Sequence, residues 1–300
     1  MQKKTYELEV VSPMFSNGAD PKAKETLEIR APSVRGQLRY WLRAIIGAQT
    51  TELKKLWEEE SEVFGTTELG SKVAVRVYPI SVDDDYIEKS EMLPHKDKPF
   101  ERSPSWAIQP EWTVTLELVA QHGEIPERVL HALHVWSLLG GLGKRSRRMF
   151  GAFKLSGGGA PTYSSPEALM DAIKKALKDA KCEVNTSPDI PRFPTLHPMH
   201  SWIIVGKRGY EDHKDAVISL FRDLLRNNTF RPKQDSFGGV RPRRSSPLIA
   251  QLRLINGRYY PVLTALRSKP DSRIDWNVVR DFMNAAARHF NAERVWGGWS

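Results

Sequence analysis

The chain opens on an alternation of apolar and polar residues that is typical of a half-buried β-strand. In the segment "TYELEVV", residues 5–11, Tyr6, Leu8 and Val10 fall on one face while Glu7 and Glu9 fall on the other. The apolar positions of residues 33–46 then recur at helical spacing, which predicts a helix with Ser33 as its N-cap.

The rest of the first half continues with two strands, a second helix and a closing strand. Residues 71–80 and 111–120 are predicted strands, and the polar, proline-containing residues 83–110 between them are expected to form a long exposed loop. Residues 125–140 predict a helix with Pro126 in its first turn and a glycine pair at its end. Residues 148–155 return as a strand, so the order βαββαβ is that of a ferredoxin-like unit.

The second half repeats this order after a linker rich in glycine and serine, residues 156–168. A short helix near residues 166–180 is followed by a strand at 200–206 and a helix at 212–227, and then a glycine pair and a basic loop lead into a strand near 248–255. We therefore predict an α+β fold of two tandem ferredoxin-like (RRM-like) domains, residues 1–157 and 158–300.

Charge adds the first indication of function. The formal net charge is +9, and three nearly acid-free stretches, residues 30–43, 141–154 and 226–244, carry more positive charge than the whole chain does. Positive charge concentrated in this way is typical of a surface that binds a polyanion.

The glycine-rich stretch "GGLGKRSRRMFGAFK", residues 140–154, is not a nucleotide-binding loop. A P-loop needs a glycine where Leu138 stands and a hydroxyl residue where Arg145 stands, and it leads from a strand into a helix rather than from a helix into a strand. Glycines that allow close backbone approach, beside arginines that donate in a fork, instead favour binding to the phosphates of RNA or DNA. A solvated charged turn is the alternative.

The first predicted helix carries Arg35, Arg39 and Arg43 at every fourth residue, so their side chains form a stripe, which we call the arginine stripe. The helix itself contains no acid to pair with them, and the segment "WEEESE", residues 57–62, is interpreted as a solvated helix end. Trp41 is expected in the core rather than as a stacking platform. The outward positions of the predicted sheet are acidic and lack aromatics, so binding is expected at loops and helix edges instead.

Catalytic and metal chemistry have little support in this sequence. The histidine pairs His131/His134 and His197/His200 lack the carboxylate or cysteine sets of metal sites, so no metal or other cofactor is predicted. Cys182 is the single cysteine, which suits a reducing compartment. No secretory signal or membrane-spanning run is present, and a cytoplasmic location without membrane attachment is expected.

Four segments in this order resemble the RAMP superfamily of CRISPR-associated proteins: "SPMFSNGAD", "LEIRAPSVRGQLRYWLRA", "VFGTTELGSKVAVRV" and "GGLGKRSRRMFGAF". Within it, the pattern is most similar to the family of first subunits of type III-B, or Cmr, effector complexes. The resemblance implies two ferredoxin-like domains and a non-catalytic role in RNA-guided antiviral defence, with guide RNA, target RNA and other subunits of the complex as partners. The RNA contacts that it implies are Asn17, Gly18, Arg35, Arg39, Lys144, Arg145, Arg147 and Arg148.

The residues themselves add Arg43 of the arginine stripe and the second basic loop, Arg241, Arg243 and Arg244, to the predicted RNA-binding set. Tandem units of this kind can bring the two basic loops toward one groove. The alternative function is a metal-independent ribonuclease of the same superfamily that processes CRISPR RNA with a histidine as general base. Neither basic loop nor the arginine stripe contains a histidine, and we expect the protein not to be an enzyme.

Overall fold

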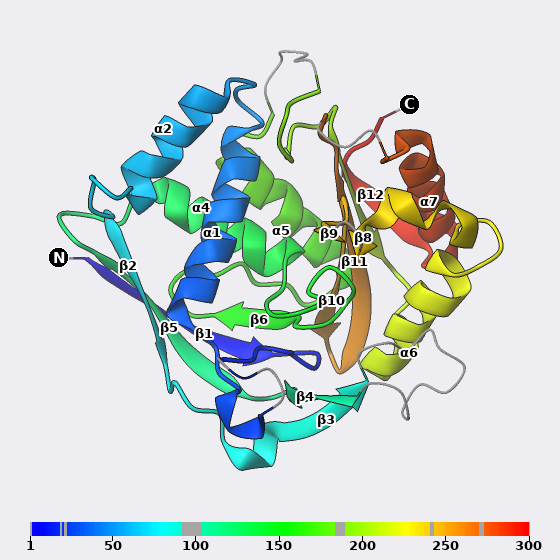
Figure 1. Ribbon diagram of the computed structural model, residues 1–300, viewed down its shortest axis with the longest axis horizontal. Coiled ribbons are helices and arrows are strands. Elements are labelled where there is room, and N and C mark those ends of the chain that lie inside the picture. Colours follow the sequence, from blue (N-terminus) through cyan, green and yellow to red (C-terminus); the bar gives the residue numbers. More distant parts are fainter. Residues whose placement is uncertain are drawn as a thin grey trace.

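The computed structural model describes residues 2–18, 20, 23–91, 104–183, 190–240, 243–269 and 273–299. The chain folds as a mixed α+β protein with two four-stranded antiparallel sheets (Figure 1). The elements of the first half are β1 (Lys3–Val10), α1 (Ala31–Ile46), α2 (Leu53–Phe64), β2 (Val73–Tyr78), β3 (Ile87–Glu91), β4 (Pro104–Ile108), β5 (Thr113–Ala120), α4 (Glu127–Leu139) and β6 (Phe153–Ser156). Those of the second are α5 (Pro166–Asp179), β7 (Ser201–Gly206), α6 (His213–Ile218), β8 (Gly239–Val240), β9 (Arg243–Arg244), β10 (Leu248–Ile255), β11 (Arg258–Leu266), α7 (Trp276–His289) and β12 (Ala292–Gly297).

The two sheets have equivalent strand orders. The first runs β2-β5-β1-β6 and the second β10-β11-β7-β12. When the four strands of each sheet are counted in chain order, the first lies between the third and the fourth in both sheets, and all the pairings are antiparallel. In β1 the predicted alternation is confirmed, because Tyr6, Leu8 and Val10 are buried while Glu7 is exposed.

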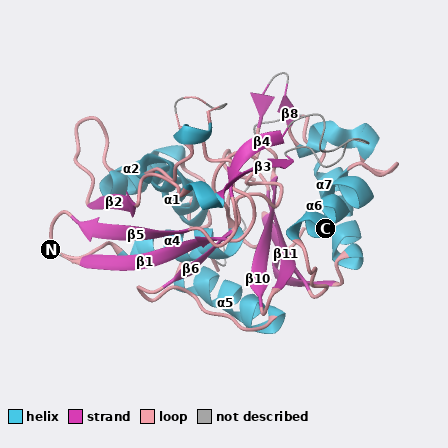
Figure 2. Cartoon of the chain, turned by 90° about the horizontal axis from the view of Figure 1, so that it is seen from below, coloured by secondary structure: helices cyan, strands magenta, loops and turns pink. Residues whose placement is uncertain are grey.

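Helices lie between the sheets and on the outer side of the second sheet (Figure 2). α1 and α4 cover one face of the first sheet, and α4 and α5 also pack on strands of the second. The other face of the second sheet packs against α6, α7 and the π-helical continuation of α6, Ser219–Leu225. Every residue of β7 is consequently buried, with Ile203 in one core and Ile204 in the other.

Several predicted boundaries are wrong for identifiable reasons. α1 begins at Ala31 rather than at Ser33, because Pro32 is accommodated in the first turn and Arg30 is the extended N-cap residue. Pro126 is itself the N-cap of α4. The strand expected from residue 148 begins only at Phe153, because the backbone of residues 147–149 bonds to Ala250 of β10 in the other half.

The segment 83–110 is not simply a loop, because β3 and β4 pair within it as a two-stranded antiparallel sheet. Residues 92–103 lie outside the described part of the chain. Trp41 is buried, as predicted. No helix in the described ranges is long and apolar enough to cross a membrane.

Candidate nucleic-acid interface

The two basic loops meet at one cleft. Residues 143–148, from the first half, and residues 238–239 and 243–246, from the second, line a cavity of about 980 Å³ together with parts of the segment 221–237. The lining cations are Lys144, Arg145, Arg147, Arg148, Arg226, Arg243 and Arg244. Asp235 is the acid among the lining residues, so the cleft is strongly electropositive.

The first loop, residues 143–148, is held by backbone contacts to both halves. Its Lys144 N–H donates to the Phe15 carbonyl at 2.9 Å, and just beyond it the Met149 N–H donates to the Ala250 carbonyl of β10 at 2.8 Å. Gly151 closes the turn with φ +61°, and a Cβ there would stand 1.8 Å from the Leu142 carbonyl oxygen. Only glycine fits this position, which explains the glycine-rich character of the stretch.

Arg147 and Arg148 attach this loop to the second half. The guanidinium of Arg147 donates to the Ser246 carbonyl at 2.6 Å and lies over the ring of Tyr40 at 5.1 Å. Arg148 donates to the Phe237 carbonyl at 2.8 Å and to the Leu248 carbonyl at 3.2 Å. Burial, followed by the charges of neighbouring arginines, lowers the pKa of Arg148 to about 9.

Lys144 and Arg145 are the other two cations of the first loop. Lys144 is exposed, and its Nζ donates to Asn17 Oδ1 at 2.9 Å. Arg145 has φ +59°, and its carbonyl accepts from the Arg148 N–H at 2.8 Å, which closes a tight turn. Burial, and secondarily the charge of Arg226, lowers the pKa of Arg145.

The second loop contributes Arg243 and Arg244 to the cleft wall, where the short strands β8 and β9 pair. Arg243 is exposed, whereas Arg244 is mostly buried and donates to the Asp235 main-chain carbonyl. Arg241, which was predicted in the same set, lies outside the described residues.

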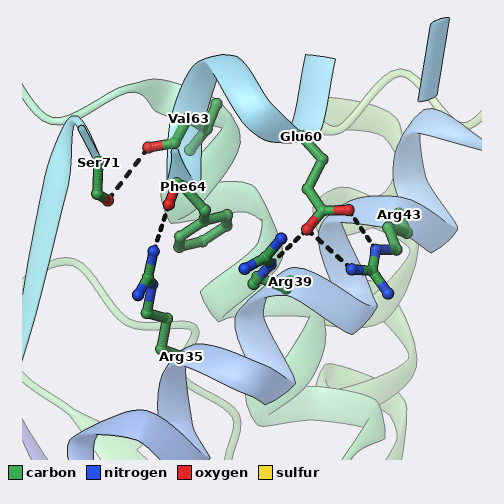
Figure 3. Close-up of polar contacts among 7 residues, drawn as sticks. All are labelled: Arg35, Arg39, Arg43, Glu60, Val63, Phe64 and Ser71. Carbon is green, nitrogen blue, oxygen red and sulfur yellow. Dashed lines mark hydrogen bonds and ion pairs between the residues drawn. The ribbon is translucent and has the colours of Figure 1, made fainter. Parts of the chain in front are cut away.

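The arginine stripe is placed differently, because it faces α2 (Figure 3). Arg39 and Arg43 both bond the carboxylate of Glu60, and Arg35 donates to the main-chain carbonyl of Phe64 at the end of α2. None of the three stripe arginines is among the residues that line the cleft.

Glu60 corrects the interpretation of "WEEESE" as a solvated helix end, because its side chain is only 2% exposed. Burial alone would raise the pKa of Glu60, but the hydrogen bonds from Arg43 and Arg39 outweigh burial, and the net pKa is lowered. The acid that the stripe lacks within α1 is therefore supplied by the neighbouring helix.

Asn17 and Gly18 lie beside the first loop rather than in the cleft. Asn17 accepts the Lys144 bond described above, and the Gly18 N–H donates to the Thr26 carbonyl at 2.6 Å. A Cβ on Gly18 would stand 2.7 Å from Glu28 Oε1 and 2.9 Å from that carbonyl oxygen. Asn17 thus gives the Lys144 ammonium a hydrogen-bond partner at the edge of the first loop.

Two arginines with structural consequences were missed as candidates. Arg226 lines the cleft from the end of the π-helical segment, and its place in the nearly acid-free stretch 226–244 was the available signal. Arg253 of β10 is buried and donates to the carbonyls of Leu138 and Gly140 at the end of α4, at 3.1 and 2.9 Å. A cation there satisfies helix-terminal carbonyls and complements the helix dipole across the two halves.

The cleft contains no histidine among its lining residues. Within the described ranges no three His, Cys, Asp or Glu side chains are grouped so that they could hold a metal ion. Partial burial lowers the pKa of His134 to about 4, and His197 and His200 are buried.

The family model of the RAMP superfamily matches residues 7–154 of the chain. Among individual relatives, the chain is similar to the CRISPR system Cmr subunit Cmr1-1 of Pyrococcus furiosus, with 27% identity over 98% of both chains. It is also 35% identical to Cmr1-2 of that organism, over 25% of this chain and 40% of the relative.

The fold is similar to that of solved relatives. The crystal structure of Cmr1 from Pyrococcus furiosus superimposes with a TM-score of 0.69 and 24% identity over the full length of both chains. A chain of the type III-B Cmr-beta complex bound to cognate target RNA and AMPPnP gives a TM-score of 0.64 with 13% identity, over 95% of this chain and 98% of that one.

Proposed function

We propose that this protein is a non-catalytic RNA-binding subunit of a type III-B CRISPR effector complex. The observation that carries the proposal is the cleft in which cations from both halves converge around a single lining acid, Asp235. The likeness to Cmr1-1 over 98% of both chains supports membership of such a complex, with guide RNA, target RNA and other subunits as partners. Its place is in antiviral defence.

We further infer that each half is a ferredoxin-like domain, residues 1–157 and 158–300. When the four strands of each sheet are counted in chain order, the second lies beside the third, the third beside the first and the first beside the fourth. This is the arrangement expected of a split βαβ unit. α5 forms part of the joint between the halves, because it packs on α4 as well as on β7 and β12.

RNA is held by its phosphates in this proposal. Lys144, Arg145 and Arg243 present cationic groups at the cleft, and arginine forks position a phosphate backbone without reading base edges. Asn17 and Gly18 act by fixing Lys144. We assign Arg147, Arg148 and Arg244 to shaping the cleft and to its field, and we assign Arg35, Arg39 and Arg43 mainly to packing α1 on α2.

The test is binding of single-stranded RNA to the full chain, measured by fluorescence anisotropy as the salt concentration increases. Neutralising about five phosphates at about −0.7 each predicts a slope near −3.5 for log affinity against log salt, with weak sequence preference. Arg243→Ala should weaken binding severalfold and make this slope shallower by about 0.7.

Two outcomes contradict the proposal. An affinity that does not change between about 50 and about 300 mM added chloride rejects phosphate contacts. Discrete RNA cleavage products from the isolated protein, lost when one histidine is substituted, would support a ribonuclease instead.

A further inference from the structure

Arg145, Arg148 and Arg226 approach one another from the two halves of the molecule. Arg145 and Arg148 stand at the two ends of the tight turn in the first loop, and Arg226 follows the π-helical segment Ser219–Leu225 of the second half. All three line the cleft, as do Phe221 and Leu225. This arrangement places three guanidinium groups around one space.

No acid among the described residues pairs with any of these three groups. In the described part of the chain, Arg145 and Arg226 have no side-chain hydrogen bond or ion pair, and Arg148 bonds only main-chain carbonyls. Burial lowers the pKa of both Arg145 and Arg148, and the charge of Arg226 lowers both further. A like-charge cluster of this kind costs free energy when empty, and an anion placed between its members removes that cost.

The chemistry of the site selects its ligand. Arg145 is half-buried and Arg226 is exposed, so a ligand has to reach them from the open side of the cleft. Guanidinium groups that approach from different elements suit a phosphate, whose oxygens point in several directions, and each can donate two parallel bonds. Arg148 lies behind them as a fixed charge that is held by the Phe237 and Leu248 carbonyls.

We propose that Arg145 and Arg226 together bind one phosphate group of the RNA, so that this phosphate links the two halves across the cleft. This inference rests on the proposed function, since it names one subsite within the RNA path. An anion that is bound by residues of both halves also stabilises the folded state, because it binds the folded protein and not the unfolded chain.

The test is a double-mutant cycle on the full chain with the variants Arg145→Ala, Arg226→Ala and the two combined. The matched control is Arg222→Ala, four residues before Arg226 on the π-helical segment. The Arg222 side chain is 71% exposed, pairs with Asp223 at 3.3 Å and does not line the cleft. Binding of a single-stranded RNA of about ten nucleotides is measured at several salt concentrations.

If one phosphate is shared, each single substitution weakens RNA binding about tenfold, and the double variant weakens it little more than a single one does. The salt slope of the double variant becomes shallower by about 0.7, the value for one phosphate. Arg222→Ala keeps the affinity and slope of the unmodified protein.

Two results overturn the shared subsite while the proposed function stands. A double variant about a hundredfold weaker, with a slope shallower by about 1.4, means two separate phosphates. An Arg226→Ala variant with full RNA affinity removes Arg226 from the path.

A second readout keeps the two proposals distinguishable if the RNA does not bind at all. Inorganic phosphate should raise the melting temperature above that in potassium chloride of equal ionic strength. This increment should be lost in the double variant and retained in Arg222→Ala. An equal increment in all the variants would overturn the subsite.

Discussion

The arginine stripe on α1 and the glycine-rich loop after α4 have similar arginine-rich, acid-free sequences but opposite surroundings. In the stripe, Arg39 and Arg43 meet the buried carboxylate of Glu60. In the loop, the hydrogen bonds that the guanidinium groups of Arg147 and Arg148 donate within the described part of the chain all go to main-chain carbonyls. A carboxylate both accepts hydrogen bonds and neutralises charge, whereas a carbonyl does only the first.

This difference shows that a run of basic residues has to be interpreted together with the partners that its side chains meet in the fold. Glu60 lowers the net charge of the stripe from +3 to +2, and the guanidinium groups of the stripe are occupied in joining two helices. The loop satisfies part of its hydrogen-bonding capacity yet keeps its full positive charge at the wall of a cavity. Field strength at a candidate RNA site therefore depends on the partners that the fold supplies, and not on the density of arginine in the sequence.

The largest effect on stability is expected from removing Glu60, the acid that pairs with the stripe. Glu60→Gln leaves Arg39 and Arg43 without their carboxylate, and loss of one partner of a fully buried ion pair costs about 3–5 kcal/mol. Because these arginines are 33% and 45% exposed, we expect a smaller loss, about 2 kcal/mol in the free energy of unfolding measured by urea denaturation.

Glu62→Gln is the matched control for that experiment. Glu62 lies on the same helix and pairs with Lys72 at 2.7 Å, but its side chain is 63% exposed. Its removal should change the free energy of unfolding by less than about 0.5 kcal/mol. Equal losses in the two variants would show that Glu60 contributes no more than a surface pair does.

Acidification should weaken the same contact more gradually. The folded-state pKa of Glu60 is lowered, so its contribution is fully present above the unfolded value of about 4.3 and is lost as the pH falls through the folded pKa. The difference in unfolding free energy between the unmodified protein and Glu60→Gln should therefore be constant from about pH 7 to about pH 5.5 and narrow at about pH 3.5. A difference that widens on acidification would contradict the ion pair.

Local features of both regions could be predicted from the sequence alone. The spacing of Arg35, Arg39 and Arg43 indicated that they share a helix face, and the alternation around Leu8 indicated the buried face of β1. These features depend on residues a few positions apart, where helix and strand geometry fix which side chains are neighbours.

The partners of those residues depend on tertiary packing and were therefore not predictable. Glu60 is 17 residues from Arg43 and 21 from Arg39, and nothing in its own acidic surroundings marks it as the buried member of its segment. Arg226 lies near Arg145 only because the second half packs against the first. The same packing pairs residues 147–149 with β10, so that β6 begins only at Phe153. Long-range pairing of this kind carries no local sequence signal.

The smallest expected effect concerns RNA binding by the stripe, which the sequence alone placed among the RNA contacts. Arg39→Gln removes one cation that Glu60 already compensates, at a site that is not part of the cleft lining. RNA affinity should therefore fall by no more than about threefold, with an unchanged salt slope, because no phosphate contact is lost. Arg145→Ala, measured beside it, should give the larger loss and the shallower slope. A tenfold loss in Arg39→Gln at full thermal stability would extend the RNA path along α1, and the carboxylate of Glu60 would then not be enough to exclude a phosphate from the stripe.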